Sequence, residues 1–172
     1  MAFERDWHDL QFAIRRSIRY HNRRRVHFDR LDKLTNMVSV VFGSAAVFGV
    51  LEHNYQALAL TAAAVVTIVS AINLVMGSSM RARDHADFAR RFVALEKEMV
   101  SAGAEESTLK QLTVKRLDIE ADEPPVLRVL DCLCHNEEMR AQGYPAEQMA
   151  KIGWWQALLA PVMDIRENHI HA

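Results

Sequence analysis

The chain has 172 residues, enough for one domain or at most two. Its formal net charge is −1, which excludes a general electrostatic attraction to nucleic acid. A quarter of the residues are charged, but between residues 34 and 80 the only charged side chain is that of Glu52. The composition therefore describes a chain with an apolar middle and two charged flanks.

Residues 1–33 form the first predicted element. They contain nine Lys and Arg residues, and neither glycine nor proline occurs between residues 4 and 33. Large apolar residues recur at helical spacing in this stretch; they are Trp7, Leu10, Ile14 and Ile18. The pattern predicts a basic cytoplasmic helix over residues 1–33 that continues into the apolar segment, because no residue here stops a helix.

Residues 34–80 carry two uncharged runs, 34–51 and 57–80, on either side of a polar connector at 52–56. As helices the runs would be about 27 and 36 Å long, against a bilayer core of about 30 Å. We interpret them as a transmembrane hairpin, since a helix on the surface of a soluble protein keeps a polar face. The alternative is a hairpin buried inside a soluble bundle.

The basic residues predict the orientation of this hairpin. Lys and Arg are frequent before residue 34 and directly after residue 80, and the connector has none. The positive-inside rule therefore places both termini in the cytoplasm and the connector outside.

Residues 81–172 are predicted to be a cytoplasmic helical region. A stripe of large apolar residues after the second run can pack against the stripe before the first, so that two long helical stems meet; it consists of Phe88, Phe92, Leu95 and Met99. The first helix stop after the second run is expected at Gly103.

Three further helices are predicted beyond Gly103. One lies within residues 104–123, and the next begins at Asp122-Glu123-Pro124-Pro125, with proline in its first turn, and ends at Gly143. The last begins at Pro145 and places Met149, Ile152, Trp155 and Leu159 on one face. We expect this last helix, with Trp154 and Leu158, to pack on the stems; the alternative is a position at the membrane interface. The polar tail from Asp164 is expected to fray.

The strongest polar groups inside the runs are matched in depth. Asn36 and Asn73 lie 18 and 19 residues from Asn54 in the connector, and Ser39 and Ser70 lie 15 and 16 residues from it. An amide in hydrocarbon is costly unless it is hydrogen-bonded. These four residues are therefore candidates for lining a pore or its inner mouth; alternatively the amides bond each other or lie at the headgroup level.

Small residues recur within the runs at a spacing of four, which lets membrane helices approach closely. Alanine-rich sequence produces the same spacing by chance, so both interpretations stand. The candidate packing residues are Gly43, Gly49, Ala59, Ala63, Thr67 and Ala71.

Basic residues flank the runs and are expected to contact anionic lipid headgroups rather than RNA, since no aromatic stacking platform accompanies them. The candidate headgroup contacts are Arg23, Arg24, Arg25, Arg30, Lys33, Arg81 and Arg83. Cys132 and Cys134 with His135 lack a second pair of ligands, so we expect no metal site and no cofactor. No pairing of nucleophile and base, or of two carboxylates, indicates a catalytic residue, and we expect no enzyme.

Two short motifs add to this pattern. A basic helix leads into the hairpin, a Glu-Pro-Pro step follows the stems, and a Cys-His-Asn-Glu run follows that. With these features the chain resembles the SLATT family over about residues 12–160. SLATT proteins are two-transmembrane effector domains associated with SMODS nucleotidyltransferases and SLOG nucleotide sensors. The positions that match the family motifs are Tyr20, His21, Glu123, Pro124, Cys134, Asn136 and Glu137.

The resemblance implies a membrane effector in a bacterial defence or conflict system, which permeabilises the inner membrane after a sensor detects a threat. Together with the pattern above, it predicts an all-α protein: a two-helix transmembrane hairpin, long helical cytoplasmic stems and additional C-terminal cytoplasmic helices. Its expected partners are the lipid bilayer, further copies of itself in a homo-oligomeric pore, and a nucleotide-signal sensor protein, with no nucleic acid. The alternative function is a non-conducting membrane scaffold that recruits a cytoplasmic signalling partner.

Overall fold

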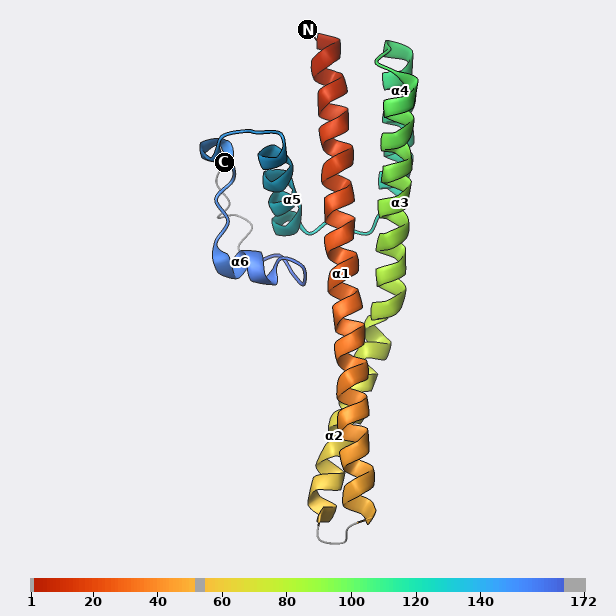
Figure 1. Cartoon of the computed structure of the whole chain (residues 1–172), viewed down its shortest axis with the longest axis vertical. Coiled ribbons are helices and arrows are strands. Elements are labelled where there is room, and N and C mark those ends of the chain that lie inside the picture. The colour runs from red at the N-terminus through yellow and green to blue at the C-terminus, as the bar shows by residue number, and fades with distance from the viewer. Residues whose placement is uncertain (1, 52–54, 166–172) are drawn as a thin grey trace. The chain divides into compact units, whose positions relative to one another are not determined.

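The computed structural model describes residues 2–51 and 55–165 (Figure 1). Helices account for the regular structure of these residues, with no strand among them, which confirms the predicted all-α class. In chain order they are α1 Ala2–Leu51, α2 Gln56–Met76, α3 Ser78–Ala102, α4 Glu106–Ala121, α5 Arg128–Ala141, the 3-10 turn η2 Ala146–Gln148 and α6 Trp154–Leu159. Residues 52–54 of the predicted connector lie outside the described residues.

The chain divides into two compact units. The first, which we call the stem unit, comprises Met1–Arg24 and His85–Ala172. The second, the apolar unit, comprises Arg25–Asp84. Helix α1 contributes residues to both units, as the absence of any helix stop in its first 33 residues predicts.

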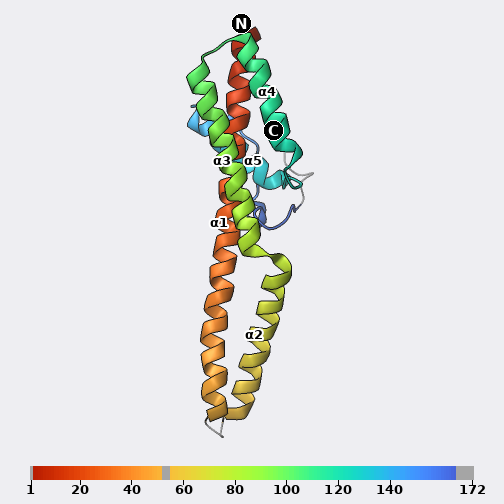
Figure 2. The same cartoon turned by 90° about the vertical axis from the view of Figure 1, so that its right-hand side faces the viewer.

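The stem unit is built around a core shared by α1, α3 and α4. Within this unit α3 and α4 run side by side, and both lie beside α1 (Figures 1 and 2). Ile14 of α1, Phe92 of α3 and Leu112 of α4 are almost completely buried in one cluster, and the two stripes predicted to pack together meet there. Burying side chains of this size stabilises the unit by about 1.5–3 kcal/mol each.

A second cluster attaches α5 and the C-terminal segment to α1. Tyr20 of α1, Val129 and Cys134 of α5, and Ala160 at the end of α6 are buried together. This cluster fixes the side of α1 that the first core leaves open, and it is the environment of the candidate residues described below.

Glycines end two of the predicted helices as expected. Helix α3 ends at Ala102, and Gly103 follows with φ 75°; α5 ends at Ala141, and Gly143 has φ 82°. Only glycine adopts such left-handed conformations without a steric cost from Cβ. The helix predicted within residues 104–123 is confirmed as α4.

The predicted start of α5 is wrong by several residues. Pro124 and Pro125 precede the helix instead of occupying its first turn, and α5 begins at Arg128. The carboxylate of Asp164 accepts hydrogen bonds from the backbone N–H groups of Arg128 and Val129, both at 2.9 Å. A carboxylate from another segment therefore caps α5, and the tail that was expected to fray from Asp164 is bound at its first residue.

The single helix predicted from Pro145 through Leu159 is also wrong. Met149 and Gly153 have extended backbones between η2 and the short α6. Asn136 of α5 explains the interruption: its amide donates to the carbonyl of Ala150 at 2.7 Å, and its Oδ1 accepts from the N–H of Ala150 at 3.0 Å. Because both backbone groups of Ala150 bond outside a helix, no helix passes through this residue.

The apolar unit pairs the second half of α1 with α2, and the two run side by side in both views (Figures 1 and 2). Ser39 faces Ser70, with 3.5 Å between the hydroxyl oxygens, whereas nearer the connector Gly49 lies against Ala59. Pairing an early residue of one helix with a late residue of the other makes the two helices antiparallel.

Helix α2 is shorter than the predicted run 57–80, which is a correction. It ends at Met76, and Gly77 has φ 57° with its N–H donating to the carbonyl of Asn73 at 2.9 Å. Helix α3 begins at once with Ser78. A glycine inside an uncharged run therefore ends the helix that was expected to continue to Gly103.

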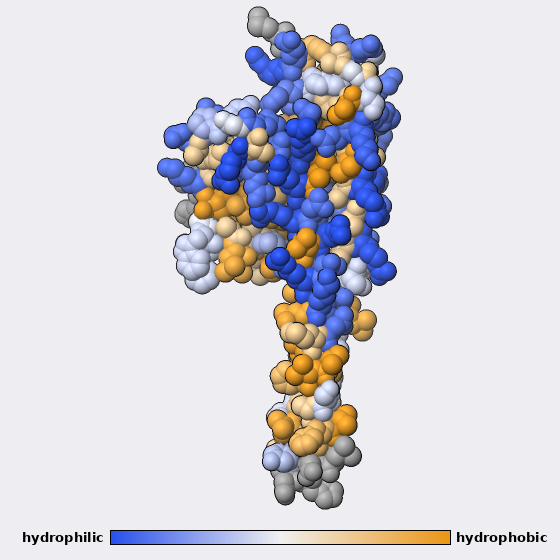
Figure 3. Space-filling view, viewed as in Figure 1, coloured by the Kyte–Doolittle hydropathy of each residue, from blue (hydrophilic) through white to orange (hydrophobic). Residues whose placement is uncertain are grey.

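Apolar side chains cover the outside of the apolar unit, seen as the orange surface over α2 and the second half of α1 in Figure 3. Two helices are long and apolar enough to span a membrane. Only 6% and 11% of their apolar segments are buried. Leu74 and Val75, for example, are 84% and 85% exposed. A core helix of a soluble bundle buries such side chains, whereas these side chains are exposed in this chain.

Candidate functional site

Two of the four predicted polar residues of the apolar unit, Asn36 and Asn73, bond an acidic residue that the sequence analysis did not single out. Asn36 donates to one carboxylate oxygen of Asp32 at 3.3 Å, and Asn73 donates to the other at 3.5 Å. The amides therefore do not bond each other, as one alternative held; each bonds Asp32. The signal available in the sequence was the spacing of four between Asp32 and Asn36 on one helix face, directly before an uncharged run.

This polar layer carries a negative charge and an unused acceptor. Asp32 supplies a carboxylate, and the Oδ1 of Asn73 is buried with no hydrogen-bond partner. Ser39 and Ser70 lie about two turns of α1 further into the run. Carboxylate, amide and hydroxyl oxygens attract cations and water. This layer is therefore the part of the apolar unit where cations and water can bind.

Most other hydroxyl groups in the runs are satisfied by their own helix. Ser44 donates to the carbonyl of Val40 at 2.8 Å, and Thr67 donates to the carbonyl of Ala63 at 2.8 Å. Thr61 likewise donates to the carbonyl of Ala57 at 3.0 Å. Such bonds remove the cost of a hydroxyl in hydrocarbon and leave less polarity for contacts with water.

The candidate packing residues divide into two groups. Gly49 and Ala59 are buried against each other inside the apolar unit. Ala63, Thr67 and Ala71 are exposed on α2, and Gly43 has open space where its Cβ would be. Their packing against a further helix stays a prediction. Gly43 also lines a groove of about 570 Å³ along α1.

The basic residues are partly engaged by the protein itself. Arg23 pairs with Glu137, and Arg24 donates to the backbone carbonyl of Pro161. For these two residues the predicted headgroup contact competes with a protein contact.

Further along the chain the other basic candidates belong to the apolar unit. Arg25 and Arg30 are exposed. Lys33 pairs with Asp29 at 3.6 Å, the guanidinium of Arg81 lies 5.7 Å from the ring centre of Phe28, and Arg83 donates to Ser79 at 3.5 Å. Headgroup contacts for these five residues stay a prediction.

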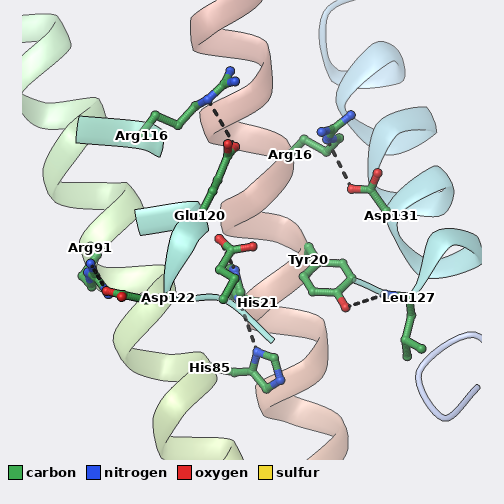
Figure 4. Close-up of polar contacts among 11 residues, drawn as sticks. Arg16, Tyr20, His21, His85, Arg91, Arg116, Glu120, Asp122, Leu127 and Asp131 are labelled. Carbon is green, nitrogen blue, oxygen red and sulfur yellow. Dashed lines mark hydrogen bonds and ion pairs between the residues drawn. The ribbon is translucent and has the colours of Figure 1, made fainter. Parts of the chain in front are cut away.

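In the stem unit, the motif residues before and after the hairpin meet around His21 (Figure 4). His21 is almost completely buried and stacks on Phe88 and Phe92. Its Nδ1 lies 2.9 Å from the Nδ1 of His85 on α3, and its Nε2 lies 3.1 Å from a carboxylate oxygen of Glu123. With a hydrogen on Nε2, His21 donates to Glu123, and its Nδ1 can accept a hydrogen bond from the Nδ1–H of His85, which satisfies both contacts.

Tyr20, next to His21 on α1, also binds the segment that connects α4 and α5. Its hydroxyl accepts a hydrogen bond from the backbone N–H of Leu127 at 3.0 Å (Figure 4). Burial raises the pKa of Tyr20, while this hydrogen bond and Arg24 act in the opposite direction. Tyr20, His21 and Glu123 thus fix the α4–α5 connection, including Pro124, against α1.

The remaining motif residues hold α5 and the segment after it. Cys134 is buried in the second core cluster, and burial raises its pKa to about 12. Asn136 clamps Ala150, and Glu137 pairs with Arg23. Sequence reasoning missed the neighbouring pair of Glu138, which is 1% exposed, with Arg19 at 2.7 Å. Two acidic residues in succession on α5, opposite basic residues on α1, were the available signal.

A polar cleft of about 690 Å³ opens beside these contacts, between α1, α5 and the α4–α5 connection. Arg16 lies 3.2 Å from the Asp131 carboxylate within it. Burial raises the pKa of Asp131, and Arg16 opposes this effect. Burial lowers the pKa of His135, and Arg16 acts in the same direction. The cleft therefore presents charges of both signs to a polar ligand.

The described residues contain no group of three or more His, Cys, Asp or Glu side chains arranged to hold a metal ion. Cys132 and Cys134 are free thiols.

Comparison with protein-family models, with curated proteins and with solved structures finds no match to this chain. The resemblance to the SLATT family accordingly stays a hypothesis carried by the residues themselves.

Proposed function

We propose that this chain is an integral protein of the bacterial inner membrane, with both termini in the cytoplasm, and that several copies assemble into a pore-forming effector. The observation that carries the proposal is the apolar unit, in which two helices of membrane-spanning length expose apolar side chains on their outer faces. In water, an apolar surface of this kind on two neighbouring helices would mark a site of interaction. A bilayer supplies the solvent that such a surface requires.

Assembly follows from the number of helices. Two helices from one chain cannot enclose a water path, so conduction requires several copies. The exposed small residues of α2 and the groove beside Gly43 offer faces where another copy can approach closely. The layer around Asp32 supplies the polar groups that an inner mouth needs.

The stem unit is the part that a signal would reach. Its mixed-charge cleft is a site for a polar ligand or for a sensor protein, and the latter is the partner that the SLATT resemblance implies. The stem unit is joined to the apolar unit through an unbroken α1, which offers a physical route for such a signal.

A non-conducting scaffold is the second candidate, and one observation favours it. Ser44, Thr61 and Thr67 bond their own helices, and both asparagines bond Asp32, so few polar groups remain to line a water path. In that case the chain anchors a signalling partner to the membrane and conducts nothing.

Ion flux separates the two functions. Purified full-length chain is incorporated into vesicles of phosphatidylcholine and phosphatidylglycerol that contain a potassium-sensitive dye. The pore predicts flux above that of protein-free vesicles, and Asn73→Leu reduces it because an apolar constriction dewets. Leu74→Ile, at the exposed neighbouring position, is the matched control and keeps the flux. Incorporated protein without flux contradicts the pore and supports the scaffold.

A further inference from the structure

The segment after η2 exposes an apolar surface on the stem unit. Between residues 149 and 163 the only charged side chain is Lys151. Trp154, Trp155 and Leu158 of α6 are 66%, 59% and 61% exposed, contrary to the prediction that they pack on the stems. Val162 and Met163 are also exposed, and we call these five residues the α6 patch.

The α6 patch belongs to an ordered segment that is bonded at several points. Ala160 is completely buried in the second core cluster. Gln156 donates to the carbonyl of Ile165 at 3.0 Å and accepts from the N–H of Gly153 at 2.9 Å. Asp164 caps α5 directly after the patch. The exposed side chains therefore result from a fixed backbone, and such a surface indicates an interaction site.

The segment that carries the patch is bonded to the last residue that the first part of α1 contributes to the stem unit. Arg24 of α1 donates to the carbonyl of Pro161, directly after the buried Ala160. In the same unbroken helix, Leu34 begins the first apolar run ten residues later.

The chemistry of the α6 patch fits lipid headgroups. The two indole rings stack with their centres 3.8 Å apart, and tryptophan is the residue most enriched at the boundary between hydrocarbon and water. Leucine, valine and methionine beside them suit shallow contact with acyl chains, and Lys151 suits an anionic headgroup. No acidic side chain within the segment repels such headgroups.

We infer that the α6 patch binds the cytoplasmic headgroup boundary of the bilayer that the apolar unit spans, and so attaches the stem unit to the membrane at a second point. The inference rests on the proposed membrane embedding. The inference goes beyond the membrane embedding because the patch lies in the stem unit, outside both apolar runs, and would contact lipid only at the membrane surface.

Tryptophan fluorescence tests this inference because the chain contains only three tryptophans. Trp7→Phe leaves Trp154 and Trp155 as the emitters. The full-length variant is incorporated into phosphatidylcholine–phosphatidylglycerol vesicles whose acyl chains carry bromine, a contact quencher, either near the headgroups or near the chain ends. We expect roughly twofold stronger quenching by the shallow bromine, as a position at the headgroup level requires. The matched control is Trp154→Phe with Trp155→Phe, which keeps Trp7 and should show little quenching by either lipid, since Trp7 packs against the stem core.

The outcomes distinguish this inference from the proposed function. Unquenched emission at the wavelength of exposed indole overturns the inference. Unquenched emission at a shorter wavelength also overturns it, because it would mean that a second copy covers the patch. In either case, protein that still resists extraction from the vesicles by alkaline carbonate keeps the membrane embedding intact. Protein that carbonate removes contradicts the embedding itself. Trp154 and Trp155 are exposed, so replacing them in the control removes no core packing.

Discussion

The contact between Gly49 and Ala59 yields a quantitative test of the apolar unit. A Cβ at position 49 would lie 2.9 Å from the Cβ of Ala59, 2.9 Å from the carbonyl oxygen of Tyr55 and 3.1 Å from the backbone nitrogen of Ala59. Two of these three atoms belong to the backbone, so no rotation of a side chain relieves the clash. At position 43, by contrast, nothing lies within 4 Å of the added atom.

The difference between the two alanine variants isolates the cost of this contact. Replacing glycine by alanine inside a helix stabilises by about 0.5–1 kcal/mol in both cases. Overpacking at position 49 adds a cost of about 1–3 kcal/mol. The stabilisation from replacing glycine by alanine is the same in both variants and cancels in their difference. The free energy of unfolding of Gly49→Ala should therefore be about 1–3 kcal/mol lower than that of Gly43→Ala. The free energy of unfolding of Gly43→Ala should equal or exceed that of the original chain.

Unfolding in mixed micelles measures this difference. The purified chain is titrated with a denaturing detergent, and energy transfer between labels on α1 and α2 reports their separation. Equal free energies of unfolding for the two variants, or a larger loss for Gly43→Ala, would refute the close approach of the helices at Gly49. Sedimentation of the same samples shows whether Gly43→Ala weakens assembly without weakening the fold, as expected if its groove receives another copy.

Two further predictions concern the stem unit. Arg19→Met should lower the free energy of unfolding by about 2–4 kcal/mol, because it leaves the carboxylate of Glu138 buried without its cation. Arg15→Met breaks the more exposed pair with Glu96 and should lower it by about 1 kcal/mol or less. Equal losses of stability in thermal unfolding would contradict this prediction. Burial raises the pKa of Cys134 to about 12, so at pH 8 only about one thiol in ten thousand is ionised. Mass spectrometry should find its alkylation in the folded chain far slower than in denaturant at the same pH, and equal rates would show that the thiol is accessible.

Much of the architecture follows from the spacing of apolar residues and from glycine. The stripes through Ile14 and Phe92 identify the stem core, and Gly103 and Gly143 mark helix ends at the edges of polar segments. The helix end at Gly77 was not predicted because this glycine lies inside an uncharged run, where hydropathy alone predicts an uninterrupted helix. The left-handed backbone conformation of Gly77 ends the helix although the residues on both sides of it are uncharged.

The features that the sequence did not predict depend on contacts between distant residues. Asp164 caps α5 from 36 residues away, and Asn136 holds Ala150 from 14 residues away. Asp32 collects both asparagines because α1 and α2 bring them together. Propensity and periodicity describe single segments, so a side chain that bonds the backbone of another segment leaves no local pattern.

The most direct test of the account asks whether the apolar unit crosses a bilayer with the stem unit on the cytoplasmic side. Tyr55→Cys places a thiol at the exposed start of α2, and Ser107→Cys places one at an exposed position of α4. In intact cells an impermeant maleimide should label the Tyr55→Cys chain and should label the Ser107→Cys chain only after permeabilisation, as the positive-inside rule predicts. Labelling at position 107 in intact cells, or the same labelling of both variants, would contradict this topology.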